Sequence, residues 1–166
     1  MTLNRHGSAV VEYPNELEIV TTREFDAPLA VVFDVFTNPE HMRHWFAPFE
    51  DQLRECSVDL RVGGGYRIVF VTPTGVDCSF RGTYLEVEPP TRTVATWLFE
   101  DWPDAHAVET VELHETHGVT KLTMRLAFRD QAGRDHMGAS DGQQSSFDKM
   151  EDYLRSLSDR SEALPK

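Results

Sequence analysis

The chain has 166 residues, of which 28 are acidic and 16 basic, and its formal net charge is −12. Nucleic acid and anionic membrane surfaces are disfavoured as partners, because both are bound through clustered lysine and arginine, whereas the basic residues here are scattered. The length fits one domain with its own core, and no run approaches the ~20 apolar residues of a membrane span. We therefore expect a cytoplasmic protein without membrane insertion.

The N-terminal residues 1–15 contain no apolar run long enough for a signal peptide and are interpreted as a flexible leader. A single domain is predicted over residues 16–160, followed by a tail at residues 161–166. The two cysteines, Cys56 and Cys78, form no C-x-x-C pair, so zinc-ribbon and thioredoxin-type sites are disfavoured and free thiols are expected. No cofactor and no metal is predicted.

The first ordered element is a strand at residues 17–25, "LEIVTTREF", which is rich in β-branched residues. A helix follows: Asp26 is a candidate cap, and Pro28 suits the first helical turn. Apolar residues then recur at helical spacing, at Leu29, Val32, Phe33 and Phe36. The Asn38-Pro39 step predicts the end of this helix and the start of a second short one, which Pro48 ends.

Strand patterns then continue to residue 128, at 53–62, 66–71, 78–88, 91–100, 106–115 and 120–128. Between the first two stand three glycines, Gly63, Gly64 and Gly65. A phosphate-binding loop would need a following helix and a Lys-Ser/Thr step, and neither is present. The glycines therefore predict a hairpin turn.

A long amphipathic helix is predicted from the segment "GASDGQQSSFDKMEDYLRSLSDR", where Ser140 and Gln143 resemble a capping box. Its apolar stripe comprises Gln143, Phe147, Met150, Leu154 and Leu157. The charged residues Asp148, Glu151, Asp152 and Arg155 are predicted to lie away from that stripe. The order of elements predicts an α+β fold, with one long helix on a curved antiparallel sheet.

Chemical motifs are sparse. His41 and His44 share a predicted helix, but two ligands are too few for a zinc site, and His114 and His117 fall near a predicted turn. There is no G-x-S-x-G nucleophile motif. Several carboxylates are candidates for general acid–base chemistry, although the sequence does not pair them in space: Glu86, Glu100, Asp101 and Glu109.

Aromatic residues gather in "HWFAPF" and "TWLFEDW", which contain Trp45, Phe46, Phe49, Trp97, Phe99 and Trp102. Two interpretations remain open at this point. The rings form part of an ordinary core, or they line an apolar ligand pocket.

A family resemblance emerges from "FDAPLAVVFDVFTNPEHMRHWFAP", "VDLRVGGGYRIVF", "FRGTYLEVEPPTRTVATWLFE" and "SFDKMEDYLRSL", taken together and in this order. Over about residues 17–158 the chain resembles bacterial homologues of the C-terminal domain of the activator of the ninety-kilodalton heat-shock chaperone ATPase. These proteins belong to the START-like superfamily, also called SRPBCC or birch-pollen-allergen-like. The chain departs from a frequent family pattern where "HMGASDGQQSSF" replaces a Gly-Trp step before the last helix.

The resemblance implies a helix-grip fold: a curved seven-stranded antiparallel sheet wrapped around the long C-terminal helix, with two short helices after the first strand. It also implies a cavity for an apolar small molecule or lipid. The implied cavity residues are Trp45, Phe46, Phe80, Tyr84, Trp97, Met124, Phe147 and Met150. Trp45 and Phe46 are expected near its mouth.

No catalytic motif is shared across the family, so the leading hypothesis is a ligand-binding protein without an assigned reaction, acting as a monomer or homodimer. Two alternatives stay open. One is a chaperone-ATPase activator with a role in stress response, which is disfavoured because no segment matches the activators' N-terminal domain. The other is a cyclase- or hydrolase-type enzyme that uses carboxylates in the same cavity.

Overall fold

A computed structural model describes residues 4–138 and 142–163. These residues form eight strands and four helices. The strands are β1 (Val10–Glu12), β2 (Glu18–Phe25), β3 (Gln52–Val58), β4 (Gly65–Val71), β5 (Asp77–Glu88), β6 (Arg92–Phe99), β7 (His106–Thr116) and β8 (Val119–Phe128). The helices are α1 (Leu29–Thr37), α2 (Pro39–Met42), α3 (Gln131–Gly138) and α4 (Gly142–Ala163).

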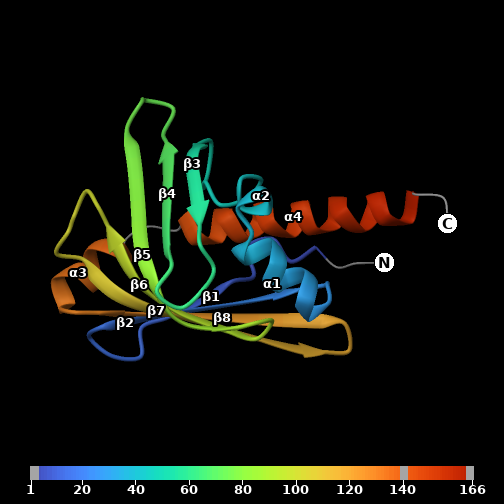
Figure 1. Cartoon of the computed structure of the whole chain (residues 1–166), viewed down its shortest axis with the longest axis horizontal. Helices are drawn as coiled ribbons and strands as arrows, with labels where there is room; N and C mark the ends of the chain where they lie inside the picture. Colours follow the sequence, from blue (N-terminus) through green and yellow to red (C-terminus); the bar gives the residue numbers. More distant parts are fainter. Residues whose placement is uncertain (1–3, 139–141, 164–166) are drawn as a thin grey trace.

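All eight strands belong to one antiparallel sheet in the order β1-β2-β8-β7-β6-β5-β4-β3. The sheet is strongly curved: β3, β4 and β5 rise away from the part formed by β2, β8 and β7 (Figure 1). A register shift between Tyr84 and Glu86 adds a β-bulge to β5, and bulges bend a sheet locally. The prediction of a curved antiparallel sheet is confirmed, and its count is corrected from seven strands to eight.

The additional strand is β1, which pairs with β2 between Val10 and Thr22. The sequence predicted no strand before residue 17. At three residues β1 is too short for an alternation pattern to identify it. It forms because β2 offers an unpaired edge on that side, so its backbone partners come from the tertiary fold rather than from its own residues.

The two short helices after the first long strand are confirmed, and Asn38 both follows α1 and caps α2, where its side chain accepts from the backbone N–H of Glu40. The predicted cap at Asp26 is wrong. Asp26 instead accepts from the guanidinium of Arg5 at 3.0 Å. The backbone N–H of Leu29 at the start of α1 donates to Glu115 on β7, at 2.6 Å.

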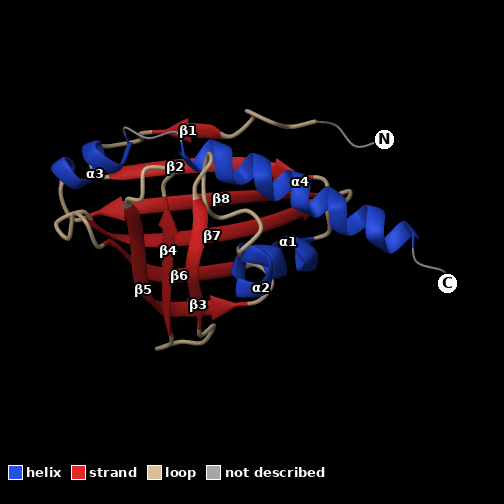
Figure 2. Ribbon diagram, turned by 90° about the horizontal axis from the view of Figure 1, so that it is seen from above, coloured by secondary structure: helices blue, strands red, loops and turns tan. Residues whose placement is uncertain are grey.

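The long helix α4 crosses the concave face of the sheet on the same side as α1 and α2, and its C-terminal part extends past the sheet (Figure 2). The predicted apolar stripe is confirmed at Phe147, Met150 and Leu154, all of which are buried. The helix ends at Ala163, within the predicted tail. Ser140, which was predicted to cap it, lies outside the described residues.

The prediction that Glu151 points away from the core is wrong, because its side chain is buried. It accepts from the guanidinium of Arg23 on β2 at 2.5 Å, and Asp148 accepts from the same guanidinium at 2.7 Å. Arg23 is itself buried, so β2 places a positive charge beneath α4. Helical periodicity alone does not detect such a partner, because it comes from another element.

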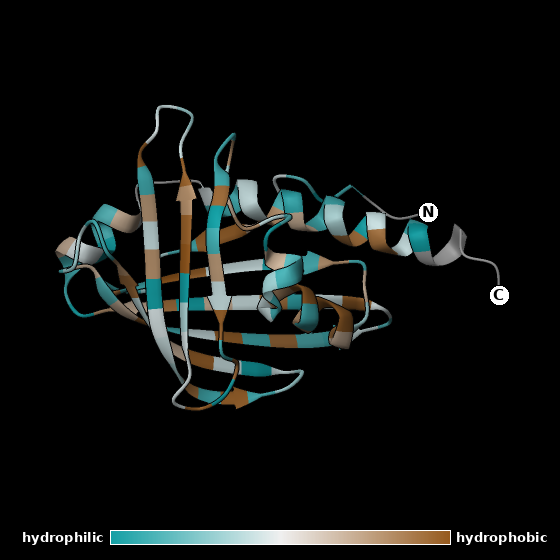
Figure 3. Ribbon diagram, turned by 45° about the horizontal axis from the view of Figure 1, so that its top comes forward, coloured by the Kyte–Doolittle hydropathy of each residue, from teal (hydrophilic) through white to brown (hydrophobic). Residues whose placement is uncertain are grey.

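Two apolar clusters form the core. The larger lies between α4, α1, α2 and the sheet and includes Phe25, Trp45 and Phe147. The smaller includes Trp97 and Phe128 and is packed near α3, a helix that the sequence analysis did not predict. Figure 3 shows hydrophobic residues along most of β4 and in α1.

Gly63 and Gly64 end the turn between β3 and β4, and Gly65 begins β4, so the predicted hairpin is confirmed. Gly63 has a φ of 85°, and a Cβ on Gly64 would lie 2.2 Å from the carbonyl oxygen of Asp59. The turn also pairs with β5: the backbone N–H of Gly63 donates to Tyr84, and the N–H of Tyr84 donates to Gly64. The glycines therefore fix the main chain of Tyr84, which lines a cavity between the sheet and α4.

Candidate functional site

A cavity of about 650 Å³ lies between the sheet and the N-terminal part of α4. This volume is within the range of pockets that bury small-molecule ligands. Aromatic and aliphatic side chains dominate its wall: Ile19, Phe36, Met42, Trp45, Phe46, Val58, Tyr66, Ile68, Phe70, Phe80, Tyr84, Trp97, Met124, Leu126 and Met137. Thr21, Thr93, Glu109 and Ser146 add polar groups. The wall draws on residues of both apolar clusters.

One row of cross-strand neighbours forms the floor of the cavity. Tyr84 on β5 is paired with Ala95 on β6, and Ala95 is paired with Glu109 on β7. The row continues from Glu109 to Leu126 on β8 and ends at Ile19 on β2. Paired residues point to the same face of a sheet. The carboxyl of Glu109 therefore lies at the centre of an otherwise apolar or aromatic row, beside the small side chain of Ala95.

Glu109 is the one charged side chain in the described part of the cavity wall. The residue is partly buried and lines the cavity. Burial raises the pKa of Glu109 to about 7, because the protein interior disfavours the ionised carboxylate. Within residues 4–138 and 142–163, no hydrogen bond or ion pair to its carboxyl is present.

Two phenols stand close to Glu109. The rings of Tyr66 and Tyr84 lie 5.7 Å apart, centroid to centroid. The pKa of each is raised by burial and, to a smaller degree, by the negative charge of Glu109, so both phenols are neutral at physiological pH. The hydroxyl of Tyr66 donates to the backbone carbonyl of Thr96 at 3.1 Å. Gly82 makes this possible, since a Cβ there would lie 1.8 Å from that same oxygen.

The structure brings six of the eight predicted cavity residues together in the wall: Trp45, Phe46, Phe80, Tyr84, Trp97 and Met124. The other two, Phe147 and Met150, lie fully buried in the larger cluster beneath α4 and are not part of the wall. Trp45 is also buried, and its indole N–H donates to the carbonyl of Val35 at 3.0 Å.

Glu109 was among the carboxylates noted in the sequence but was not placed in the cavity. A signal for its position exists in "HAVETVELHE". Ala107, Val111 and Leu113 alternate with outward residues, and Glu109 falls on their face of the strand. A single acidic residue among inward-facing apolar residues indicates a buried carboxyl. The total number of acidic residues does not reveal this, because it ignores which face of the strand each one occupies.

The histidines form no metal site with one another. His41 lies between Asp34 and Tyr153, 3.0 Å and 2.6 Å away, and His44 stacks on the ring of Tyr153. His41 on α2 and His44 just after it therefore both contact α4.

One group of potential metal ligands is present in the described chain, at His6, Glu151 and Asp152. Glu151 already accepts hydrogen bonds from Arg23 and from the backbone of Arg5. We therefore interpret this group as the network that joins the N-terminal segment to α4.

The cysteines offer no activated nucleophile. Both are free, on the two strands that flank β4. Burial raises the pKa of Cys56 to about 11, and burial together with nearby carboxylates raises the pKa of Cys78. A raised pKa leaves little thiolate at neutral pH.

Comparison with known protein families identifies the relationship. The family model described as activator of Hsp90 ATPase homolog 1-like protein matches residues 26–155, which include every element from α1 to most of α4. The chain belongs to this family. The predicted START-like relationship is thereby confirmed. No curated protein matches the chain.

Solved structures of bacterial proteins share the activator-like fold. A protein from Rhodobacter sphaeroides has a TM-score of 0.83 at 20% identity, with 89% of this chain and 99% of that chain covered. Protein NE0264 from Nitrosomonas europaea has a TM-score of 0.77 at 26% identity, with 88% and 99% covered. CalU16 from Micromonospora echinospora has a TM-score of 0.60 at 24% identity, with 86% and 79% covered.

None of the described helices is long and apolar enough to cross a bilayer.

Proposed function

We propose that the protein binds a largely apolar small molecule or lipid in the cavity between the sheet and α4. The observation that carries this proposal is the cavity itself, about 650 Å³ in volume and lined mainly by aromatic and aliphatic side chains. Burying such a ligand removes apolar surface from water, which contributes roughly 25 cal/mol per Å². The six predicted aromatic and methionine residues in the wall would make the contacts, and the few polar groups would set the orientation.

A titration with n-decanol tests this proposal. Trp45 and Trp97 both line the wall, so occupancy changes tryptophan emission. We expect saturable binding by the wild type. Thr93→Phe should abolish it, because Thr93 is buried in the wall and the larger ring fills the space.

The matched control is Leu85→Phe, on the outer face of β5, where the side chain is 47% exposed. This variant should bind as the wild type does. Equal binding by Thr93→Phe and the wild type would place the ligand elsewhere and contradict the proposal.

General acid–base catalysis in the same cavity is a second candidate function, and Glu109 is the observation that favours it. A pKa of about 7 lies near physiological pH, where a carboxyl exchanges protons most effectively with a substrate. Deuterium exchange at the α-carbon of bound 2-decanone, followed by NMR, tests this function. Loss of exchange in Glu109→Gln supports a catalytic role, whereas exchange no faster than in buffer argues against it.

Activation of a chaperone ATPase is the alternative that the family's description supplies. It would use the surface rather than the cavity. The chaperone's ATP turnover should then rise equally with the wild type and with Thr93→Phe. No rise with either protein would exclude this alternative.

A further inference from the structure

We infer that the cavity selects ligands that carry a protonated amine on an apolar body, with the amine paired to Glu109. This inference rests on the proposed ligand binding and specifies the chemical class of the ligand. It follows from charge and hydrogen bonding inside the cavity, where the described residues of the wall offer one acidic group and no basic one.

The carboxyl of Glu109 has no partner among the described residues. Glu109 lies in the centre of the cavity floor, and the described residues provide no hydrogen bond or ion pair to it. A buried polar group without a partner destabilises the protein, and a buried charge does so more strongly. A ligand that supplies a donor to this carboxyl removes that cost, whereas a purely apolar ligand increases it by displacing water.

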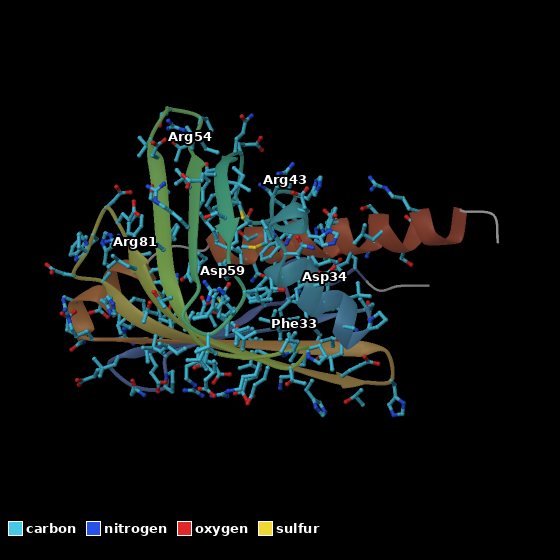
Figure 4. The ribbon with its side chains drawn as sticks, viewed as in Figure 1. Phe33, Asp34, Arg43, Arg54, Asp59 and Arg81 are labelled. Atoms are coloured by element: carbon cyan, nitrogen blue, oxygen red, sulfur yellow. The ribbon has the colours of Figure 1, made fainter. Side chains whose placement is uncertain are left out.

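The described part of the wall also lacks basic side chains. Its described residues include no lysine, arginine or histidine. Arg43, Arg54 and Arg81, labelled in Figure 4, lie after α2, on β3 and on β5, and none of them lines the cavity. A fatty-acid carboxylate would therefore enter without a counter-ion and would face the carboxyl of Glu109, so repulsion and desolvation both oppose it.

Aromatic rings surround the carboxyl of Glu109. Tyr66 and Tyr84 lie close to Glu109, and Trp97 lies on the adjacent strand β6 with Phe80 against its ring at 5.3 Å. The negative faces of aromatic rings attract ammonium groups, most strongly in desolvated sites. A cation therefore gains both from the carboxylate and from the rings.

Three probes of equal chain length test the inference by calorimetry at pH 8: n-decylamine, n-decanol and decanoate. We expect the wild type to bind the amine about 10- to 100-fold more tightly than the alcohol, which is the range of a hydrogen bond to a charged group. Decanoate should bind most weakly. Glu109→Gln should remove the preference for the amine, so that the variant binds decylamine and decanol with affinities within about threefold of each other.

Glu112→Gln is the matched control, because Glu112 lies on the same strand, exposed on its outer face, and the change removes the same formal charge. It should keep the preference for the amine. A preference that persists in Glu109→Gln, or equal binding of amine and alcohol by the wild type, would overturn the inference and leave cavity binding intact. If none of the three probes binds, the proposed function fails together with the inference.

The pH dependence gives a readout on the unmodified protein. Tyr66 and Tyr84 face Glu109 from β4 and β5, and both stay neutral. The third phenol in the described wall, Tyr13, donates its hydroxyl to the backbone carbonyl of Gly138. β6 and β8 present Thr93, Met124 and Leu126, and α4 presents Gln143, Gln144 and Ser146. Amine affinity should therefore fall by up to about tenfold per pH unit as the pH drops from 7 to 5 and Glu109 becomes protonated. Decylamine stays charged throughout, as lysine does. An affinity that is constant over this range would contradict the pairing.

Discussion

The guanidinium of Arg23 on β2 and the carboxylate of Glu151 on α4 form a buried ion pair, with 2.5 Å between Nη2 and Oε1. Asp148 and Glu151 are one helical turn apart and accept from the two terminal nitrogens of the same guanidinium. Glu151 also accepts from the backbone N–H of Arg5. The position of α4 on the sheet, and hence the roof of the cavity, therefore depends on a charge contributed by β2.

Replacement of Arg23 by Met should destabilise the protein by about 3–5 kcal/mol, because it removes the buried cation that Asp148 and Glu151 share and leaves Glu151 only the more exposed guanidinium of Arg155. Urea unfolding measures the change. Arg54→Met provides the control: Arg54 pairs with Asp77 at the surface, its side chain is 64% exposed, and its loss should cost less than about 1 kcal/mol. Equal effects of the two changes would show that the buried pair contributes no special stability.

Gly82→Ala should destabilise the protein by about 2 kcal/mol or more, because the new Cβ would meet the backbone oxygen of Thr96. The contact of 1.8 Å joins the Cβ, whose position the backbone of residue 82 fixes, to a backbone oxygen. No side-chain rotation can therefore relieve it. Gly65→Ala, one strand away, has its nearest atom at 3.4 Å and should change stability by less than about 0.5 kcal/mol. Thermal unfolding of both variants checks this, and a neutral Gly82→Ala would refute the close approach.

The stability of the wild type relative to Glu109→Gln should fall as the pH rises. The folded protein holds the proton of Glu109 up to a pKa of about 7, whereas the unfolded chain loses it near the ordinary value of 4.5. The unfolded state therefore binds fewer protons between these values, and stability decreases with pH by up to about 3 kcal/mol in total. Chemical unfolding of both proteins at pH 4, 6 and 8 gives the difference. A difference that stays constant with pH would mean that Glu109 is solvated.

Much of the fold was predictable from local patterns, as β8 illustrates. Leu122, Met124 and Phe128 are buried on one face, while Lys121 and Arg125 are exposed, as the alternation predicted. The glycine turn was predictable too, because a following strand excludes a phosphate loop. These features depend on residues that are near one another in the sequence.

The parts that were missed depend on distant partners. β1 forms on an edge that β2 provides, and Glu151 is buried because Arg23 lies beneath it. Asp26 is a good cap by residue type, but Arg5 binds it and Glu115 takes its place at α1. Local propensity competes with tertiary contacts, and the sequence alone does not state which contacts form.

The candidate site likewise combines features that the local sequence predicts with features that depend on distant contacts. Aromatic residue types and the family resemblance predicted Phe80, Tyr84 and Trp97 in the wall, but they did not distinguish the cavity from the closed core around Met150. That distinction depends on how far α4 stands from each strand. The central place of Glu109 likewise depends on which strands flank β7, a property of the pairing order rather than of the strand itself.

The methionine methyl groups offer the most direct test of the cavity as a binding site. Met42, Met124 and Met137 line the cavity, whereas Met150 is fully buried in the closed core. Methyl NMR of protein labelled with ¹³C-methionine, titrated with n-decylamine, should show saturable shifts at the first three and little change at Met150. Uniform or non-saturating shifts, or shifts at Met150 with none at the other three, would contradict ligand binding between the sheet and α4.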